Sequence, residues 1–376
     1  MWTFSCPTIV CGDHALDYLH LIQDKKAFVV TEKELTPSGL IQRVTDQVMA
    51  AGTQCLIFDQ VENELNQDVV ERGGRMIGEY QPDWIIALGS RVCMDTAKSI
   101  TRQLANGGRA AEKQVRFMAI PVTMDSDSDI LPAHDETQIL SMAEHLSDIP
   151  DVAILAPEMY AHLSLSVIAE ISMGALCKAI EGYTSPWGSC LTDGPTLMAS
   201  RLVIENLPLV SQQGEEGEAR NQLQRAAFLA ELASSQAPLA GLAQCAAGAL
   251  SITHMLPFGI AAGLMLPYAM MFLINGSIQT TGKYAEIARF CGLTHDASSE
   301  GALSLVTKIQ TCAAQLGHPT CLRTCIADSE QFEATLPEMV TKILSQGSIQ
   351  SAARVPDQEK LTRLFRCAYE GWPIDF

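Results

Sequence analysis

A long run without charged residues limits what this chain can fold into. From residue 232 to residue 282 the sequence contains no Asp, Glu, Lys or Arg, although 18% of the whole chain is charged. Small residues alternate there with large apolar ones, and Gly and Pro interrupt the run. Such a segment has to leave water, either in a globular core or in a membrane.

The membrane interpretation is the weaker of the two. A transmembrane helix needs about 20 consecutive apolar residues, and the nearest candidate, 259–275, has Pro267 in its middle. No cluster of Lys or Arg flanks it within a few residues. We therefore expect this run to form buried helices or the wall of a binding site.

Length and charge narrow the class of protein. A chain of 376 residues with 47% hydrophobic content is expected to form one large or two medium globular domains. Its formal net charge of −18 argues against nucleic acid and membrane as partners, because phosphates would be repelled. The sequence begins without a signal peptide and has 12 scattered cysteines, so we expect a cytoplasmic protein with reduced thiols.

Short apolar runs alternate with helical patterns in the first part of the chain. This pattern predicts a parallel sheet covered on both faces, and so a doubly wound, Rossmann-like α/β domain of the dinucleotide-binding type over residues 1–155. The predicted strands are 27–31, 55–58, 84–88 and 117–121, and the helical patterns between them include 39–51 and 67–79.

The pattern of apolar residues changes after Pro157. Residues 166–183, 192–208 and 219–235 have helical period and length, and no strand signal of comparable strength follows. We expect an all-α domain over residues 156–376. A cleft between the two domains is the default place for a small molecule.

The order and spacing of several segments resemble the iron-type (group III) alcohol dehydrogenases, which share the dehydroquinate-synthase-like fold. The chain looks most like the 1-propanol dehydrogenases of bacterial microcompartments. The resemblance implies NAD(P) and iron or zinc as the family's cofactors. The segments that carry it are 84–98, 120–131, 150–157, 173–183, 240–275 and 368–371.

The first cofactor loop has lost most of its glycines. The family has three glycines and a serine there, which let the backbone approach a pyrophosphate at a helix N-terminus. Residues 89–92 instead read Gly-Ser-Arg-Val. On its own the segment reads as a strand-to-helix turn with an ion pair between Asp95 and Lys98. The resemblance implies vestigial cofactor-binding positions at Gly89, Ser90, Asp95 and Lys98.

The second cofactor loop has aspartates, Asp125 and Asp127, where the family has glycines. A carboxylate about 5 Å from a phosphate charge costs roughly 3 kcal/mol at an effective dielectric of ~20, so dinucleotide binding should weaken. Thr123 and Ser128 are the vestigial cofactor positions here. A calcium loop would use Asp125, Asp127, Asp129 and Glu136. However, Ile130 stands where its glycine is needed, and a solvated acidic loop is expected instead.

The metal ligands are also replaced. The family places an Asp and a His on one helix face and two further His on the next core helices. Here the resemblance puts Gly174, Lys178, Gln244 and Phe258 at these positions, and none is a competent divalent-metal ligand of the expected kind. The family's additional active-site His corresponds to Gly248.

Two other groups of possible ligands carry less weight. His254 lies nearby in sequence, but a lone His among apolar residues is more often a packed core residue. Cys321, Cys325 and His318 could ligate zinc, but a second half-site with tight spacing is missing. We therefore expect no bound metal.

Lys178 has two interpretations. A neutral, buried lysine could act as a base or as a Schiff-base nucleophile, with Glu181 beside it. Alternatively, Lys178 and Glu181, three residues apart on one helix, could form an ion pair that fills the old metal cavity. We prefer the ion pair.

A fold kept while its chemistry is replaced is typical of a pseudoenzyme. We expect a catalytically silent relative with a binding, regulatory or assembly role, as a homo-oligomer or as a hetero-oligomer with an active relative. The first alternative is an active NAD(P)-dependent alcohol dehydrogenase with a rearranged site, because some members of the wider family lack the metal and still transfer hydride. The second is a metal-independent enzyme that uses Lys178 with Glu181, or Asp95 and Lys98, on a small molecule in the interdomain cleft.

Overall fold

The computed structural model describes residues 6–23, 25–106, 115–124, 149–212, 217–235 and 240–376. Contacts divide these residues into two units, with the change from the first to the second between Leu163 and Ser164. The predicted boundary lay after residue 155. The short helix α5 (Pro157–Ala161) belongs to the first unit, so the division falls several residues later.

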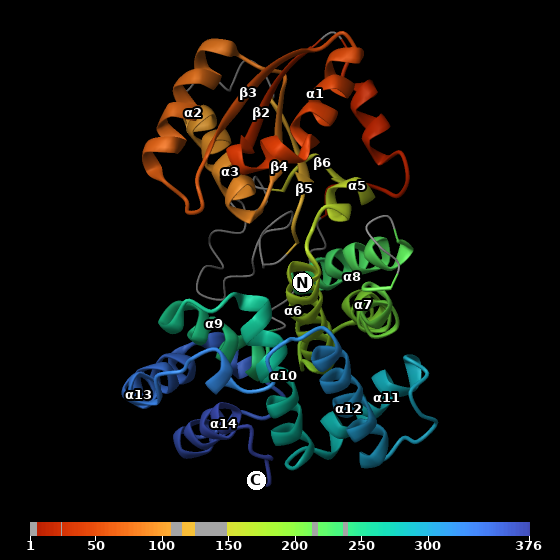
Figure 1. Ribbon diagram of the computed structural model, residues 1–376, viewed down its shortest axis with the longest axis vertical. Coiled ribbons are helices and arrows are strands. Elements are labelled where there is room, and N and C mark those ends of the chain that lie inside the picture. The colour runs from red at the N-terminus through yellow and green to blue at the C-terminus, as the bar shows by residue number, and fades with distance from the viewer. Residues whose placement is uncertain (1–5, 24, 107–114, 125–148, 213–216, 236–239) are drawn as a thin grey trace. The chain divides into compact units, whose positions relative to one another are not determined.

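The first unit is built on a parallel sheet (Figure 1). Its order is β1-β6-β5-β4-β2-β3, and every pairing between neighbours is parallel. The four predicted strands are all present, and the predicted fold class is confirmed. The strands are β1 (Thr8–Cys11), β2 (Lys26–Glu32), β3 (Gln54–Val61), β4 (Trp84–Gly89), β5 (Arg116–Pro121) and β6 (Val152–Leu155).

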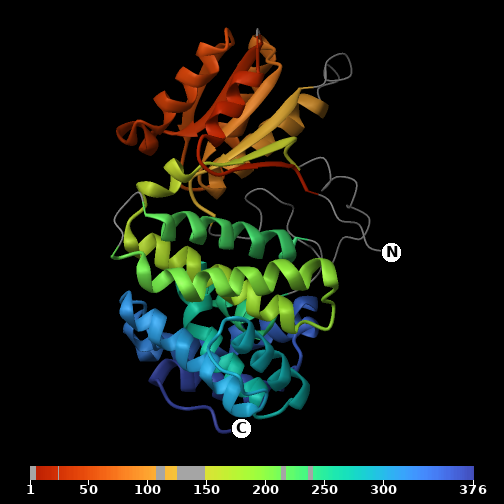
Figure 2. The ribbon, with the colours of Figure 1, turned by 90° about the vertical axis from the view of Figure 1, so that its right-hand side faces the viewer.

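Helices cover both faces of this sheet (Figures 1 and 2). Ala27 and Val29 of β2 pack into one apolar cluster, with α1 (Leu40–Ala50) and η1 (Ala15–Leu21). Phe28 and Val30 point the other way, into a cluster with α2 (Gln67–Tyr80) and α3 (Arg91–Asn106). Alternate residues of one strand therefore supply two cores. A further 3-10 turn, η2 (Lys33–Ser38), precedes α1.

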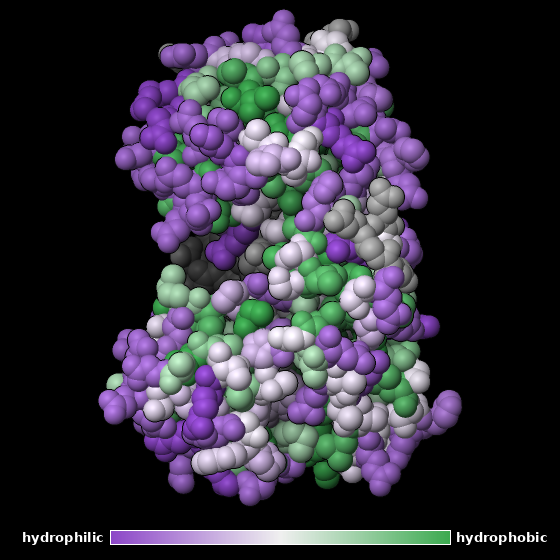
Figure 3. Space-filling view, viewed as in Figure 1, coloured by the Kyte–Doolittle hydropathy of each residue, from purple (hydrophilic) through white to green (hydrophobic). Residues whose placement is uncertain are grey.

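The outer side of α2 is polar. Glu71, Arg75 and Glu79 are exposed at helical spacing, while Val70 and Ile77 are buried. Figure 3 shows hydrophilic side chains over this helix, at the upper left of the view. The structure therefore confirms the helical pattern predicted for residues 67–79, with one apolar and one polar side.

The second unit is helical, and the part of it that the structure describes contains no strand. This agrees with the predicted all-α domain. The helices are α6 (Leu165–Thr184), α7 (Cys190–Asn206), η4 (Leu207–Leu209), α8 (Glu218–Ser234), α9 (Leu242–His254), α10 (Phe258–Ile274), α11 (Ile278–Phe290), α12 (Ser299–Gln315), η5 (Leu322–Thr324), α13 (Ser329–Ser345), η6 (Gly347–Ser351) and α14 (Gln358–Glu370).

The uncharged run forms α9 and α10, and α10 crosses α6 closely. A Cβ added to Gly259 of α10 would lie 2.3 Å from the carbonyl oxygen of Glu170 in α6. A Cβ on Gly263 would lie 2.7 Å from Cβ of Met173. The apolar character of α10 on all sides follows from this burial. None of the helices in the described ranges is long and apolar enough to cross a membrane.

The close crossing predicts opposite effects for two glycines in neighbouring helices. Gly259→Ala should destabilise the fold by about 1–3 kcal/mol, because a methyl group has to push the backbone of α6 away. Gly248→Ala in α9 meets nothing within 4 Å and should stabilise the helix by about 0.5–1 kcal/mol. Urea unfolding of the two variants measures both. Equal effects would contradict the close crossing.

Candidate functional site

Three of the four positions that the resemblance assigns to metal ligands lie together. Gly174 and Lys178 are one turn apart on α6 and so share a face. Lys178 Nζ lies 5.8 Å from the ring centre of Phe258, the first residue of α10. A Cβ added to Gly174 would lie 4.0 Å from Cδ1 of the same ring. The α6–α10 contact therefore brings these positions to one place.

Lys178 forms a buried ion pair with Glu231 of α8. Its Nζ lies 3.2 Å from Glu231 Oε2, and the two side chains are 5% and 4% exposed. The Phe258 ring adds a cation–π contact within the usual range. The predicted pair between Lys178 and Glu181 is wrong, because the carboxylate beside this ammonium comes from another helix.

Glu181 has a different role. Its carboxylate accepts hydrogen bonds from the backbone N–H groups of Gly241 (3.1 Å), Ala243 (2.6 Å) and Gln244 (3.0 Å). The first N–H groups of α9 have no partner within the helix, and a carboxylate there also meets the positive end of the helix dipole. These donors direct Glu181 toward α9, which explains why it does not pair with Lys178. Burial raises the pKa of Glu181, and the hydrogen bonds oppose that rise.

Gln244, the fourth position, is held by the same carboxylate. Its Nε2 donates to Glu181 Oε2 over 3.1 Å. The side-chain amide nitrogen is therefore turned toward Glu181, and the residue is 8% exposed. Gly248, one turn further along α9, meets nothing within 4 Å of an added Cβ.

These residues do not fit a divalent metal. Iron and zinc need lone pairs from imidazole, carboxylate or thiolate. Gly174 and Phe258 offer none, and Lys178 is a paired cation. Within the described ranges, no three or more His, Cys, Asp or Glu side chains are arranged to hold a metal ion, including the Cys321, Cys325 and His318 group.

An internal carboxylate occupies the first cofactor turn. Glu32, at the end of β2, accepts a hydrogen bond from the backbone N–H of Ser90 over 3.0 Å and a second from the Ser90 hydroxyl. A Cβ added to Gly89 would lie 3.2 Å from Glu32 Cδ. Sequence reasoning missed Glu32. The available signal was an acidic residue at the end of a strand beside the glycine turn.

The other predicted cofactor positions are only partly described. Asp95 pairs with Arg91 over 3.3 Å, so the predicted pair between Asp95 and Lys98 is wrong. An i,i+4 partner on the same exposed helix face is within reach of Asp95, whereas Lys98 is buried. The Thr123 hydroxyl is buried and has no hydrogen-bond partner among the described residues. Positions outside the described residues are Asp125, Asp127, Ser128, Asp129 and Glu136.

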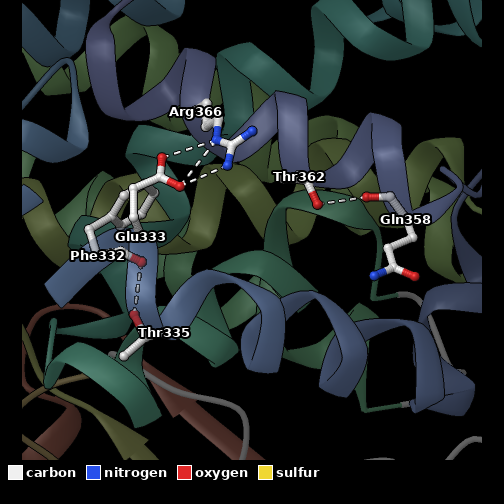
Figure 4. A network of polar contacts seen from close by, with 6 residues as sticks. All are labelled: Phe332, Glu333, Thr335, Gln358, Thr362 and Arg366. Carbon is white, nitrogen blue, oxygen red and sulfur yellow. Dashed lines mark hydrogen bonds and ion pairs between the residues drawn. The ribbon is translucent and has the colours of Figure 1, made fainter. Parts of the chain in front are cut away.

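The outer helices brace α9. His254 Nε2 lies 3.1 Å from the Thr335 hydroxyl, and its ring packs near Phe332 of α13. Figure 4 shows how α13 is tied to α14 by Arg366, whose guanidinium donates to both carboxylate oxygens of Glu333. His254 is therefore packed against α13, but it is only half-buried and does not lie in the core.

His318 is a buried imidazole of the second unit. It is 5% exposed, and its Nδ1 lies 3.1 Å from the carbonyl oxygen of Pro319. A Cβ added to Gly263 would lie 2.9 Å from Nε2, so the ring packs on the bare backbone of α10. Burial lowers the pKa of His318, and the nearby carbonyls of Pro319 and Gly259 oppose the change.

Comparisons with known proteins agree with this architecture. The model of iron-containing alcohol dehydrogenase matches residues 6–157, and the C-terminal model of the Fe-containing alcohol dehydrogenase family matches residues 168–369. The chain belongs to the iron-containing alcohol dehydrogenase family. The predicted resemblance is confirmed.

Individual relatives are distant but aligned over their full length. The NADPH-dependent butanol dehydrogenase of Clostridium saccharobutylicum is 25% identical over 100% of both chains. The 1-propanol dehydrogenase PduQ of Citrobacter freundii is 26% identical over 97% of this chain and 99% of its own. The iron-containing alcohol dehydrogenase of Thermococcus thioreducens has a similar fold, with a TM-score of 0.82 at 24% identity, covering 98% of this chain and 100% of its own.

The buried ion pair predicts a non-additive double-mutant cycle. Lys178→Met and Glu231→Gln should each destabilise the fold by roughly 3–5 kcal/mol, because each change removes a charged partner from a buried pair. The double variant should lose clearly less than the sum of the two. Urea unfolding of the four proteins measures this, and additive losses would show that the two side chains are not coupled.

His318 predicts a loss of stability in acid. Its pKa is lowered in the folded state, so below about pH 6.5 the unfolded chain binds more protons, and the unfolding free energy falls as the pH drops. His318→Asn should make the pH dependence between about pH 5 and 7 shallower, by at most ~1.4 kcal/mol per pH unit. The control is the same substitution at the exposed His295, and an equal change of slope in both variants would contradict the role of His318.

Proposed function

We propose that this chain is a member of the iron-containing alcohol dehydrogenase family that does not bind the catalytic metal ion and does not catalyse metal-dependent alcohol oxidation. We infer that it has a binding, regulatory or assembly role instead. One observation carries this proposal: Lys178 is buried at a position that the resemblance assigns to a metal ligand, and it is paired with Glu231 under the ring of Phe258.

Electrostatics support the proposal. Two unit charges 4 Å apart interact by roughly 4 kcal/mol at an effective dielectric of 20, and a divalent ion doubles this. A buried ammonium at a ligand position therefore repels the ion that the ligand would hold. The Glu231 carboxylate offsets part of that repulsion, but it is already paired with Lys178. Gln244 does not compensate, because its amide nitrogen is directed at Glu181.

The cofactor turn supports the same proposal. Backbone N–H groups at the start of a helix are the usual partners of a pyrophosphate. Here the N–H of Ser90 is already bonded to the Glu32 carboxylate. A phosphate at this place would meet a negative charge and would have to displace it. We therefore expect neither a nucleotide nor a metal as a resident cofactor.

The Lys178-dependent enzyme has less support than the silent relative. A base or a Schiff-base nucleophile must be a neutral amine, and a carboxylate 3.2 Å away favours the charged ammonium. Glu181, the second predicted catalytic residue, is committed to the start of α9. The alternative of an active NAD(P)-dependent alcohol dehydrogenase is supported by the relatives, since one of them is named as an NADPH-dependent butanol dehydrogenase.

The proposal predicts that the purified chain binds no divalent ion in stoichiometric amount and gains no thermal stability from NAD(H) or NADP(H). The reason is that charges of the wrong sign stand at both sites. Elemental analysis by mass spectrometry and a thermal-shift assay measure these two quantities. A stoichiometric iron or zinc ion, or tight dinucleotide binding, would support the active dehydrogenase instead.

A restored variant is the positive control. Gly174→Asp, Lys178→His, Gln244→His and Phe258→His together should recover divalent-ion binding if only the ligands were lost. The new Asp Cβ would lie 4.0 Å from the Phe258 ring, which is an ordinary contact, and 3.3 Å from Cα of Gly259, so the backbone of α10 has to move by a few tenths of an ångström. A matched variant with Gly174→Asn, Lys178→Gln and Phe258→Gln should bind no ion. If the restored variant folds but binds no ion, then more than the ligands has changed.

A further inference from the structure

A pocket of about 360 Å³ lies in the second unit and shares no residue with the metal or cofactor positions described above. Helix α10 supplies Met271 to its wall, α12 supplies Leu303 and Val306, and the segment after α14 supplies Trp372 and Ile374. The volume is within the range of small-molecule sites. Because these three parts of the chain are far apart in sequence, the pocket exists only in the folded unit.

The wall of this pocket is uncharged. The described residues that line it include no Asp, Glu, Lys, Arg or His, although 18% of the chain is charged. An ion that entered would lose part of its hydration and would meet no opposite charge there. The net charge of −18 on the chain also repels anions over a longer distance. The wall therefore favours a neutral ligand.

The polar groups of the pocket are few. The hydroxyl of Tyr268 donates to the carbonyl oxygen of Thr320 over 3.0 Å, and the hydroxyl of Thr307 donates to the carbonyl oxygen of Leu303 over 3.0 Å. Both hydrogens are therefore used within the chain. Gln310, which is exposed on α12, brings an amide with two donors and one acceptor to the pocket. A ligand that is mostly apolar and carries one hydrogen-bonding group fits this set.

Trp372 gives the pocket an aromatic surface. Gly371 ends α14 with a φ of 78°, and the N–H of Trp372 donates to the carbonyl oxygen of Cys367 over 2.9 Å. In this Schellman motif the residue after the glycine frequently packs back on its own helix. Trp372 is instead 57% exposed and lines the pocket. Its indole therefore offers a flat face on which an aromatic ring can stack.

The segment that carries this indole is also anchored beyond the pocket, close to α10 (Figure 1). Ile374 is 5% exposed, and its carbonyl oxygen accepts a hydrogen bond from Nδ2 of Asn275 over 3.1 Å. Asp375 pairs with Arg363 over 2.6 Å, and the Phe376 ring centre lies 4.1 Å from the same guanidinium. The third wall is thus formed before a ligand arrives, so binding does not have to order it.

We propose that this pocket is a ligand site for a neutral small molecule that has an aromatic ring and one hydrogen-bonding group. The ring stacks on Trp372 and contacts the thioether of Met271, which favours aromatic partners. The polar group bonds to the Gln310 amide. This inference goes beyond the proposed function and does not rest on it, because the pocket contains none of the residues on which that function depends.

A fluorescent probe of this class tests the proposal. N-phenyl-1-naphthylamine is neutral, has one N–H group and about 17 non-hydrogen atoms, and becomes brighter in apolar surroundings. At the efficiency of drug-sized ligands its Kd should be on the order of 100 µM. The full chain is titrated from about 5 to 500 µM into a fixed, low concentration of the probe. If the wild type shows no saturable binding over this range, the proposal is overturned.

Two substitutions on α12 locate the bound probe. Thr307→Trp places a large side chain in the pocket and should weaken binding at least about tenfold. Thr311→Trp is the matched control, because Thr311 is exposed one turn further along α12, outside the pocket, and its hydroxyl bonds one turn back in the same way. This control should bind like the wild type, and equal affinity of the two variants would overturn the proposal.

A second pair of variants is independent of α12. Trp372→Ala removes the stacking surface and should also weaken binding about tenfold. Trp187→Ala is its control, since Trp187 is 50% exposed in the same unit but does not line the pocket. If circular dichroism shows that Thr307→Trp does not fold, this pair decides alone. Sedimentation should give Thr307→Trp the mass of the wild type, and loss of a wild-type oligomer would show that a second copy occupies the pocket instead.

A charged analogue tests the class of ligand. The probe 8-anilino-1-naphthalenesulfonate has the same rings and an added sulfonate. Because no cation lines the described part of the pocket, the binding that Thr307→Trp removes should be at least about tenfold weaker for the sulfonate than for the neutral amine. Equal affinity of the two probes for the pocket would overturn the assignment to neutral ligands.

Discussion

The carboxylate of Glu181 fixes where α9 begins, and the candidate site depends on that contact. A Cβ on Gly241 would lie 2.5 Å from Glu181 Cδ, so only a bare backbone lets the carboxylate reach the first N–H groups of α9. Four hydrogen bonds then offset the cost of burying this charge. Because the contact also holds Gln244, it sets which face of α9 is turned toward α6.

Helix α6 buries a cation and an anion three residues apart, yet it does not pair them. Lys178 meets Glu231 of α8, and Glu181 meets α9. Each charge therefore ties α6 to a different neighbour, which fixes the packing of three helices better than one internal pair would. The approach of α10 to Gly174 adds the Phe258 ring over the ammonium. Burial of the ion pair is tolerable because the packing that excludes water also supplies the partners.

Local signals predicted the elements of the fold but not the partners within the site. The four strands found from sequence are β2, β3, β4 and β5, which have six to eight residues in the structure, whereas β1 and β6 have four residues each and were missed. The Lys178–Glu181 pair was predicted from spacing along one helix, but spacing cannot show that α8 and α9 offer better partners. Glu32 was missed for a similar reason, since it bonds to Ser90, 58 residues away. The sequence shows which residue stands at each metal-ligand position, but the partner of that residue depends on tertiary contacts.

At both candidate sites, a carboxylate of this chain is bonded to a group that could otherwise contact a ligand. The N–H of Ser90, the start of α9 and the ammonium of Lys178 are groups that could serve an anionic or polar ligand, and each is bonded to a carboxylate of this chain. Such internal pairs raise the cost of binding any ligand, because the ligand must first break them. Internal pairs of this kind therefore support the proposal that the chain does not carry out metal-dependent alcohol oxidation.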